Sequence, residues 1–348
     1  MYNIIDLFCG IGGFSYGFEM TKEFKTILGV DFWDVALNTF KLNHPSTEIK
    51  QGDIRELDES IFCKYKGITD VIIAGPPCQG FSMAGRRDVL DERNNLFREV
   101  LRVVGIVKPK VVVIENVLGL LSMTTPEGLN VKDVILDGLR DLGYHADIKV
   151  LTASEYGVPQ NRKRTIFIAS LMNNVKFPIE QYGEGKKPYV TVGDAIGNIP
   201  NAGGFYLEAL NDYQKLMSGR KDIQNHEPIN HSKLIVKRMH SVPQGGNWMD
   251  IPLEFGQGGG THSNNYRRLK LDEPSITIKH VSKSMIIHPI YDRTPTVREV
   301  ARIQSFNDDF ILTGTKYDQH QQLANAVPPL LGKAIAESVL DILGDYYG

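Results

Sequence analysis

A cysteine in a rigid turn is the first candidate for chemistry in this sequence. Cys78 follows the apolar run Val71–Ala74 and the pair Pro76–Pro77, whose rings restrict the local backbone. A thiolate is a strong nucleophile, and the cations of Arg86 and Arg87 are close enough in sequence to favour that ionised form. The alternative is a buried, inert thiol. Packing alone would not require the flanking prolines and glycines, so the pattern favours a nucleophile.

A carboxylate closes the next apolar run. Glu115 and Asn116 come directly after Val111–Ile114, at the expected end of a strand. A carboxyl group there belongs either to a site or to a paired position in the core. In a site, a buried carboxylic acid can deliver a proton. A solvated strand end is the alternative, and Glu115 alone does not exclude it.

Two arginines stand before a further apolar run. Arg162 and Arg164 flank Lys163 ahead of Thr165–Ala169. In an extended segment, alternate residues share a face, so the two guanidinium groups are expected to lie together. Such a pair suits a phosphate or a carbonyl oxygen. An ordinary basic surface strand is the alternative.

A glycine turn near the start predicts a ligand at the end of the first strand. Gly10 and Gly12 follow the apolar run 3–8. Asp31 stands about 20 residues further on, where an acid can hold ribose hydroxyls. Ser15 occupies the place of the third glycine in a dinucleotide fingerprint, so a nucleoside cofactor without phosphates, such as S-adenosyl-L-methionine, is favoured. Glycine turns also close many strand–helix units that bind nothing.

Three further side chains could complete a nucleoside site. Asp53, after a third expected strand, could accept a hydrogen bond from an adenine amino group. Phe8 and Phe32 could contact the adenine faces. All three stand next to the ends of expected strands.

The elements that must position these residues alternate between strand and helix. Near-continuous Val and Ile runs separated by helical patterns predict an α/β fold, with a doubly wound, mostly parallel sheet and helices on both faces. Ligands of such sheets bind at the carboxyl ends of the strands, where the candidate residues stand. The expected strands are 3–8, 25–30, 71–74, 110–114 and 146–151, and the expected helices are 13–20, 34–42, 96–107 and 131–142.

The amino-acid composition of the chain changes between residues 183 and 290. Gly, Asn, Pro and His become frequent there and helical periodicity weakens, which predicts a second, irregular domain. Helical order returns over Thr296–Ile303, where Thr296 and Glu299 fit a capping box. A last helix is expected over 328–343. The expected division is 1–186 with 322–348 for one domain, and 187–321 for the other.

Composition limits the classes of protein. The 348 residues carry 39 Lys and Arg against 41 Asp and Glu, a net charge of −2, which excludes a small polybasic DNA binder. Eight basic and five acidic residues between His226 and His288 still give a local charge of +3. The absence of a signal peptide and of a membrane-length apolar run, together with only three cysteines, predicts a cytoplasmic protein without a membrane partner.

The order of these motifs matches one family. The chain resembles the C5 DNA cytosine methyltransferases of the bacterial modification type, which implies their Rossmann-like methyltransferase fold. The matching segments are Asp6–Gly17, Val30–Asp34, Gly52–Asp53, Gly75–Ser82, Asn94–Phe97, Glu115–Val117, Gln160–Arg164, Arg293–Phe306 and Gln322–Pro329. About Pro188–Ile290 lacks a motif, and there the family keeps its variable target-recognition region.

The resemblance implies a DNA (cytosine-5-)-methyltransferase, EC 2.1.1.37, that flips a cytosine out of double-stranded DNA. Cys78 would attack C6 of the base, Glu115 would protonate N3, and Arg164 would hold O2. Arg162 would support Arg164. The methyl group of S-adenosyl-L-methionine would pass to C5 and leave S-adenosyl-L-homocysteine, with no metal involved. The segment Gly80–Asn95 is expected to close over the flipped base.

The resemblance also implies binding residues. The cofactor residues would be Phe8, Gly10, Gly12, Asp31, Phe32, Asp53, Ile54, Leu96 and Asn325, and Trp33 competes with Phe32 for stacking on adenine. The DNA contacts would include Ser82, Arg86, Arg87, Gln244, Asn247, Arg267 and Arg268. Arg298 and Glu299 would organise the recognition domain. A monomer is expected, with a cognate restriction endonuclease that acts separately or with none.

Three alternatives remain open at this point. The tRNA cytosine methyltransferase branch shares the fold and nucleophile, but it tends to carry a proline where Gly80 stands. A catalytically silent binder of cofactor and DNA would not need Cys78, Glu115 and Arg164. A zinc enzyme is suggested by the nine histidines, but no closely spaced ligand pair supports it. Exposed or DNA-facing histidines are the preferred interpretation.

Overall fold

The structure is a computed structural model of the whole chain, and it describes residues 1–77, 96–172, 174–201, 203–256 and 264–347. The chain divides into two compact units. The first contains Met1–Thr152, Lys163–Glu180 and Pro329–Gly348, and the second contains Ala153–Arg162 and Gln181–Pro328. This division differs from the expected one, because Ala153–Arg162 belongs to the second unit and the chain re-enters the first unit at Pro329.

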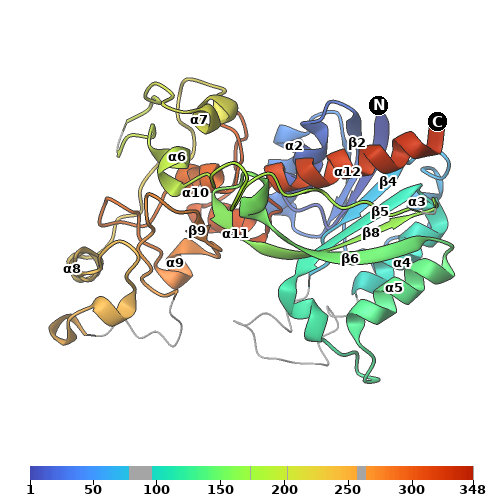
Figure 1. Cartoon of the computed structure of the whole chain (residues 1–348), viewed down its shortest axis with the longest axis horizontal. Coiled ribbons are helices and arrows are strands. Elements are labelled where there is room, and N and C mark those ends of the chain that lie inside the picture. The colour runs from blue at the N-terminus through green and yellow to red at the C-terminus, as the bar shows by residue number, and fades with distance from the viewer. Residues whose placement is uncertain (78–95, 173, 202, 257–263, 348) are drawn as a thin grey trace. The chain divides into compact units, whose positions relative to one another are not determined.

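A seven-stranded sheet is the centre of the first unit (Figure 1). Its strand order is β3-β2-β1-β4-β5-β8-β6. The five strands from β1 to β5 run parallel, whereas β8 is antiparallel to both β5 and β6. The predicted mostly parallel sheet is therefore confirmed. The strands are β1 (Tyr2–Leu7), β2 (Phe24–Asp31), β3 (Glu48–Gln51), β4 (Val71–Ala74), β5 (Val111–Val117), β6 (His145–Thr152) and β8 (Lys163–Ser170).

Burial on both faces explains the apolar strands in the middle of the sheet. All four residues of β4 and the first six of β5 are buried, so their sequences do not alternate between apolar and polar. The prediction that Glu115 follows this strand is wrong, because β5 continues to Val117. Pairing with β4 ends at Ala74 and Ile114, but β8 continues the ladder and places Glu115 opposite Ile166.

Helices cover both faces of the sheet. Figure 1 shows α2 (Asp34–Asn43) and α12 (Pro329–Tyr347) on one face, and α4 (Leu96–Val107) and α5 (Val131–Asp141) on the other. α3 (Ser60–Cys63) packs on α4. The packing stripe of α4 has helical spacing, with buried residues Leu96, Phe97, Val100, Val103, Val104 and Val107.

A close crossing brings the last helix into the first unit. α12 packs on α1 (Gly13–Glu19). A Cβ atom on Gly17 would lie 2.4 Å from the carbonyl oxygen of Pro329 and 2.8 Å from the Cα atom of Gly332. Only glycine permits this approach of the two backbones. The expected final helix is thus confirmed, with its end extended to Tyr347.

The second unit consists of short elements. Its helices are α6 (Val192–Ile196), α7 (Asp212–Met217), α8 (Lys233–Ser241), α9 (Val281–Ser284), α10 (Val297–Ile303) and α11 (Lys316–Asn325), and its strands β7 (Gln160–Asn161) and β9 (Ser275–Ile276) pair with each other. The predicted capping box at Thr296 and Glu299 is confirmed. Among the described residues, no helix is both long and apolar enough to cross a membrane.

Buried arginines hold this irregular backbone together. Arg298 is fully buried and donates hydrogen bonds to the carbonyl oxygens of Gln224, Asn307 and Phe310. Arg302, also fully buried, forms an ion pair with Asp308. Loop carbonyl groups that lack a helix or sheet partner need other donors when they are buried, and the guanidinium groups supply them.

Candidate active site

Asp31 joins the carboxyl ends of three neighbouring strands. Its Oδ2 atom accepts a 2.8 Å hydrogen bond from the backbone N–H of Gly10, and its Oδ1 accepts one of 2.9 Å from Trp33. The carbonyl oxygen of Asp31 accepts a 3.0 Å bond from the N–H of Gly52. Burial raises the pKa of the Asp31 carboxyl group above its ordinary value, although these donors act against that rise. The ends of β1, β2 and β3 therefore form one connected rim.

The turn after β1 is shaped by glycine. Gly10 and Gly12 have φ of +53° and +83°, in the left-handed region. A Cβ atom on Gly12 would lie 2.4 Å from Nε2 of His44 and 2.8 Å from the ring of Phe40. Phe8 also has a positive φ, of +59°, which costs conformational energy in a residue other than glycine.

Gly12→Ala is expected to destabilise the protein and to weaken binding at the predicted cofactor site. The left-handed backbone costs about 1–2 kcal/mol for a residue with a side chain, and the clash with His44 adds about 1–3 kcal/mol of overpacking. Gly143→Ala is the matched control, because Gly143 has φ of +91° but nothing within 4 Å of the added Cβ. Urea unfolding and S-adenosyl-L-homocysteine binding should both show a larger loss for Gly12→Ala, and equal losses would contradict this role of the glycine.

The other predicted cofactor residues of the first unit surround this rim. Phe32 is 67% exposed, whereas Trp33 is half-buried, so the Phe32 ring is the more accessible of the two. Asp53 pairs with Arg55 at 2.6 Å, and this guanidinium lowers the pKa of the carboxyl group. Ile54 and Leu96 are buried in the same apolar core.

Sequence reasoning missed a buried pair that supports the glycine turn. His44 is buried, and its Nδ1 lies 2.9 Å from the Glu19 carboxylate at the end of α1. Its ring stacks on Phe40 at 4.4 Å between centroids. Burial opposes ionisation of Glu19, but the hydrogen bond and charge of His44 and the hydrogen bonds from Thr26 together outweigh it, so the pKa of Glu19 is lowered. The only signal in the sequence was a histidine at the end of an expected helix.

Asp6 is a second residue that the sequence did not reveal. It lies inside β1, is 1% exposed, and accepts a 2.6 Å hydrogen bond from Ser15 Oγ. Burial raises the pKa of Asp6 to about 8, with further repulsion from Asp31 and Glu19. Asp6 is therefore mainly a neutral acid at pH 7. Its signal was an acid within an apolar run.

Asp6→Asn is expected to be more stable than the wild type, by a free energy of unfolding that grows as pH rises. The pKa of Asp6 is higher in the folded state than in the unfolded state, so its stabilising contribution is complete below pH 4 and is lost as pH rises towards 8. An amide cannot ionise, so the variant should escape this loss, which is at most about 1.4 kcal/mol per pH unit. Urea unfolding between pH 5.5 and 9 measures the difference, and parallel pH profiles for the two proteins would contradict a buried neutral Asp6.

Glu115 and Arg164 form an ion pair across adjacent strands. Nε of Arg164 lies 2.5 Å from Oε1 of Glu115, and each side chain is 11% exposed. Nη1 of Arg164 also donates to the carbonyl oxygen of Lys163 at 2.8 Å. The antiparallel pairing of β5 with β8 brings the two together, since Val117 stands opposite Arg164. The predicted acid and the predicted oxygen-binding arginine therefore belong to one pair.

The same rim holds the backbone that leads to Cys78. The N–H of Gly75 donates to the carbonyl oxygen of Leu7 at 3.2 Å. The side-chain amide of Asn116 donates to the carbonyl oxygen of Pro76 at 3.0 Å. A Cβ atom on Gly75 would lie 3.7 Å from Oε2 of Glu115. Cys78, Ser82, Arg86 and Arg87, and the predicted lid Gly80–Asn95, lie outside the described residues.

Arg162 and Arg164 do not act as the pair that strict alternation predicted. The N–H of Arg162 donates to the carbonyl oxygen of Gln160 at 2.9 Å, so the chain bends instead of running fully extended. The buried guanidinium of Arg162 donates to the carbonyl oxygen of Ala324 at 2.8 Å within the second unit. The following residue, Asn325, is exposed and accepts a 2.9 Å hydrogen bond from Gln321.

Two of the four described candidates for DNA contact have other roles. Arg268 is buried, donates to carbonyl oxygens that include those of Val242 and Met239, and pairs with Asp292 at 2.6 Å. Its guanidinium is thus used inside the second unit, which disfavours the predicted contact with DNA. The buried Asn247 caps the short helix Trp248–Asp250, because its side-chain oxygen accepts a hydrogen bond from Met249 N–H. Gln244 is exposed and Arg267 is half-buried, so both remain candidates.

The preferred interpretation of the histidines also needs correction. His226, His280 and His288 are buried rather than exposed or facing DNA. Burial lowers the pKa of His288 to about 4, so this imidazole is neutral near pH 7. His240 fits the exposed interpretation. No group of three potential metal ligands occurs in the described part of the chain.

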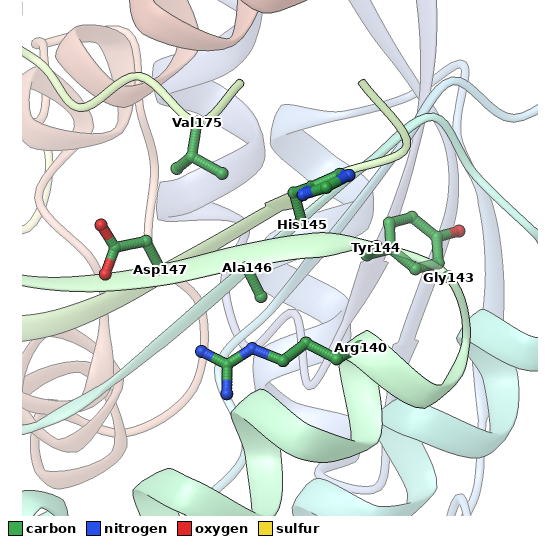
Figure 2. A pocket seen from close by; sticks show the side chains of 7 residues that line it. All are labelled: Arg140, Gly143, Tyr144, His145, Ala146, Asp147 and Val175. Atoms are coloured by element: carbon green, nitrogen blue, oxygen red, sulfur yellow. The ribbon is translucent and has the colours of Figure 1, made fainter. Parts of the chain in front are cut away.

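A surface hollow of about 540 Å³ lies at the end of the sheet away from the Asp31 rim (Figure 2). It is lined by Arg140, Gly143, Tyr144, His145, Ala146, Asp147 and Val175. His145 begins β6 and stands opposite Ser170, which in turn stands opposite Val111 at the start of β5. The hollow therefore lies at the amino ends of the parallel strands, whereas ligands of such sheets bind at the carboxyl ends.

The fold and this rim define an α/β methyltransferase. The chain belongs to the family of C-5 cytosine-specific DNA methylases, whose family profile matches residues 2–341. Its activity is that of a DNA (cytosine-5-)-methyltransferase. This assignment decides against the tRNA-methylating and zinc-enzyme alternatives.

Individual relatives agree with the family assignment. Type II methyltransferase M.DdeI of Desulfomicrobium norvegicum is 36% identical, over 97% of this chain and 88% of the relative. Type II methyltransferase M1.HphI of Haemophilus parahaemolyticus is 39% identical, over 97% and 86%. A solved DNA modification methyltransferase encoded within an E. coli prophage has a TM-score of 0.81 at 25% identity, over 99% of this chain and 100% of that one. The S. pombe Dnmt2 structure, with a TM-score of 0.63 at 17% identity over 100% and 99%, shares the fold.

Proposed function

We propose that this chain methylates cytosine at a specific double-stranded DNA site, using S-adenosyl-L-methionine and a covalent adduct through Cys78. The observation that carries the proposal is the Glu115–Arg164 pair, which lies beside the backbone leading to Cys78. The two relatives at 36% and 39% identity are named Type II methyltransferases. A role in restriction–modification, with a separate endonuclease or with none, is consistent with those names.

The residues of the first unit fit a nucleoside cofactor. A Cβ atom on Gly10 would meet nothing within 4 Å, so the turn leaves open space there, and the half-buried Asp31 carboxylate suits ribose hydroxyls. Phe32 offers an exposed ring for the adenine face, and Asp53 an acceptor for its amino group. Phe8, Gly10, Ile54 and Leu96 would complete the wall in this unit, and Asn325 is a further proposed cofactor residue. S-adenosyl-L-methionine would supply an activated methyl group in this site.

Each catalytic side chain has a distinct task in the proposed reaction. The Cys78 thiolate forms a bond to C6 of the flipped cytosine, and the displaced electron pair moves into the ring towards N3. Glu115 delivers a proton to N3 and so allows the ring to accept these electrons. Arg164 donates to O2 of the base while it holds Glu115, and Arg162 positions the segment at Ala324.

The remaining steps restore the enzyme. C5, made electron-rich by the bond at C6, accepts the methyl group, and its hydrogen then leaves as a proton to a base. The S–C6 bond breaks, which returns the thiolate, and N3 gives its proton back to Glu115 as neutral 5-methylcytosine is released. S-adenosyl-L-homocysteine is the second product. Ser82, Arg86, Arg87, Gln244 and Arg267 are the proposed DNA contacts.

Bisulfite sequencing tests this function directly. DNA from bacterial cells that express the protein should contain 5-methylcytosine at one recurrent sequence, and DNA from cells expressing the Cys78→Ala variant should not. The recurrent sequence would also identify the target site. Absence of any protected cytosine, with folded protein present, would contradict the proposal.

A further inference from the structure

Arg102 makes a set of contacts that the proposed mechanism does not use. It lies on α4, and its Nη2 atom donates a 2.9 Å hydrogen bond to the carbonyl oxygen of Ile54, 48 residues away in sequence. Its Nε atom donates to Glu99 at 2.7 Å, and Nη1 lies 3.9 Å from Glu59. The guanidinium carbon lies 6.0 Å from the ring centroid of Phe62. Arg102 is therefore held on several sides in one orientation.

The contact with Ile54 anchors the turn that follows β3. The Asp53 carboxylate accepts from Arg55, and the Asp53 carbonyl oxygen accepts a 2.9 Å hydrogen bond from Glu56. Both bonds lie within the turn, so they set its shape but not its place on the unit. Gly52 connects one end of the turn to Asp31, as described above, and Arg102 connects its middle to α4.

The same helix carries another proposed wall of the cofactor site. Leu96 is the first residue of α4, six positions before Arg102, and it belongs to the apolar core that includes Ile54. A shift of the Asp53 turn relative to α4 would separate these two walls. The hydrogen bond from Arg102 opposes such a shift, at a place where one side of the turn is exposed to solvent.

We propose that Arg102 is a positioning residue for the cofactor. By holding the Ile54 carbonyl group, it keeps the Asp53 carboxylate and the Ile54 side chain in a fixed position relative to Leu96. Arg102 itself touches neither the cofactor nor the base. This inference rests on the proposed function, because it concerns the nucleoside site named there.

The test compares two matched arginines. Arg102→Met keeps an unbranched apolar stem over Phe62 but removes every donor. Arg140→Met is the control. Like Arg102, Arg140 pairs with a carboxylate three residues before it on the same helix, Asp137 at 2.9 Å. Unlike Arg102, it lines the hollow at the amino ends of the parallel strands. Calorimetric titration with S-adenosyl-L-homocysteine gives Kd, and methylation of a DNA substrate gives KM for S-adenosyl-L-methionine and kcat.

Arg102→Met should raise Kd and KM by about three- to tenfold, as expected for one lost hydrogen bond to a positioned group. Its kcat at saturating cofactor should stay within about twofold, and Arg102→Lys should recover part of the affinity because lysine can still reach a carbonyl oxygen. Arg140→Met should bind like the wild type. A merely structural role would lower the melting temperature without this split between KM and kcat.

Several outcomes would overturn the inference. They are an unchanged Kd for Arg102→Met, an equal loss in Arg140→Met, or a fall in kcat alone. If Arg102→Met does not fold, Glu99→Gln serves instead, since it loosens the guanidinium and should raise Kd about twofold or more; an unchanged Kd would be equally decisive. Failure of the wild type to bind S-adenosyl-L-homocysteine would instead refute the proposed function itself.

Discussion

Replacing Cys78 by alanine is expected to lower methyl transfer by about a thousandfold or more. Without the sulfur atom, no bond to C6 can form, and C5 of an unactivated cytosine is too electron-poor to accept a methyl group. Binding of S-adenosyl-L-homocysteine should stay within about twofold of the wild type, because the glycine turn and Asp31 are untouched. Transfer of tritiated methyl groups to DNA measures the first effect, and calorimetry measures the second.

A trapping experiment separates this mechanism from other reasons for lost activity. A DNA duplex with 5-fluorocytosine at the target should form a stable adduct, since fluorine on C5 cannot leave as a proton does. Peptide mapping by mass spectrometry should place the adduct on Cys78 in the wild type and find none in Cys78→Ala. Substantial turnover by the variant, or an adduct on another residue, would refute the assignment of Cys78.

The sheet could be predicted from the sequence because its signals are local. Runs such as Val71–Ala74 and Val111–Ile114 are apolar at every position, which is typical of strands buried on both faces. The rule that ligands bind at the carboxyl ends of parallel strands then placed Asp31 and Glu115 at one edge. The hydrogen bonds of Gly10 and Gly52 to Asp31 agree with that placement.

The partners of charged residues could not be predicted in the same way. Periodicity places a side chain on a face, but it does not say which distant atom that side chain meets. The bend at Arg162 and the ladder that extends β5 to Val117 depend on contacts with other strands, so Arg164 meets Glu115 while Arg162 meets Ala324. Arg268 appeared as a surface cation in the sequence, yet it satisfies carbonyl groups of an irregular backbone.

Buried neutral acids are hidden from sequence reasoning for a related reason. Asp6 is one polar residue in an apolar run, and only the environment of its side chain in the folded protein distinguishes a neutral acid from a charged one. Its hydrogen bond with Ser15 and its burial are both products of the fold. The same holds for His44, whose partner Glu19 lies 25 residues away.

Glu115→Gln is the second substitution from which a large effect is expected. Glutamine keeps the size of the side chain beside Arg164, but it cannot deliver a proton to N3. Loss of a general acid typically costs about 10²- to 10⁴-fold in rate. We therefore expect kcat to fall by that amount, with adduct formation on 5-fluorocytosine DNA slowed to a similar degree and Kd for S-adenosyl-L-homocysteine nearly unchanged.

The ion pair between Glu115 and Arg164 allows a test of whether the two residues act together. Arg164→Met removes the partner of Glu115 and a donor to O2, so it should also lower kcat. If the two residues act as one unit on the base, the double variant Glu115→Gln with Arg164→Met should be little worse than the poorer single variant. Multiplicative losses would instead mean that the acid and the arginine act independently.

Asp70→Asn provides the matched control for both variants. Asp70 forms a 2.5 Å ion pair with Lys110 in the same unit, and both residues are half-buried. This pair lies just before β4 and β5 begin, at the amino edge of the sheet, whereas Glu115 and Arg164 lie at the carboxyl edge. Loss of a similar pair away from the rim should lower the free energy of unfolding but leave kcat within about twofold. A comparable fall in kcat for Asp70→Asn would mean that breaking an ion pair anywhere in the sheet disables the enzyme, and it would remove the case for Glu115 as the proton donor.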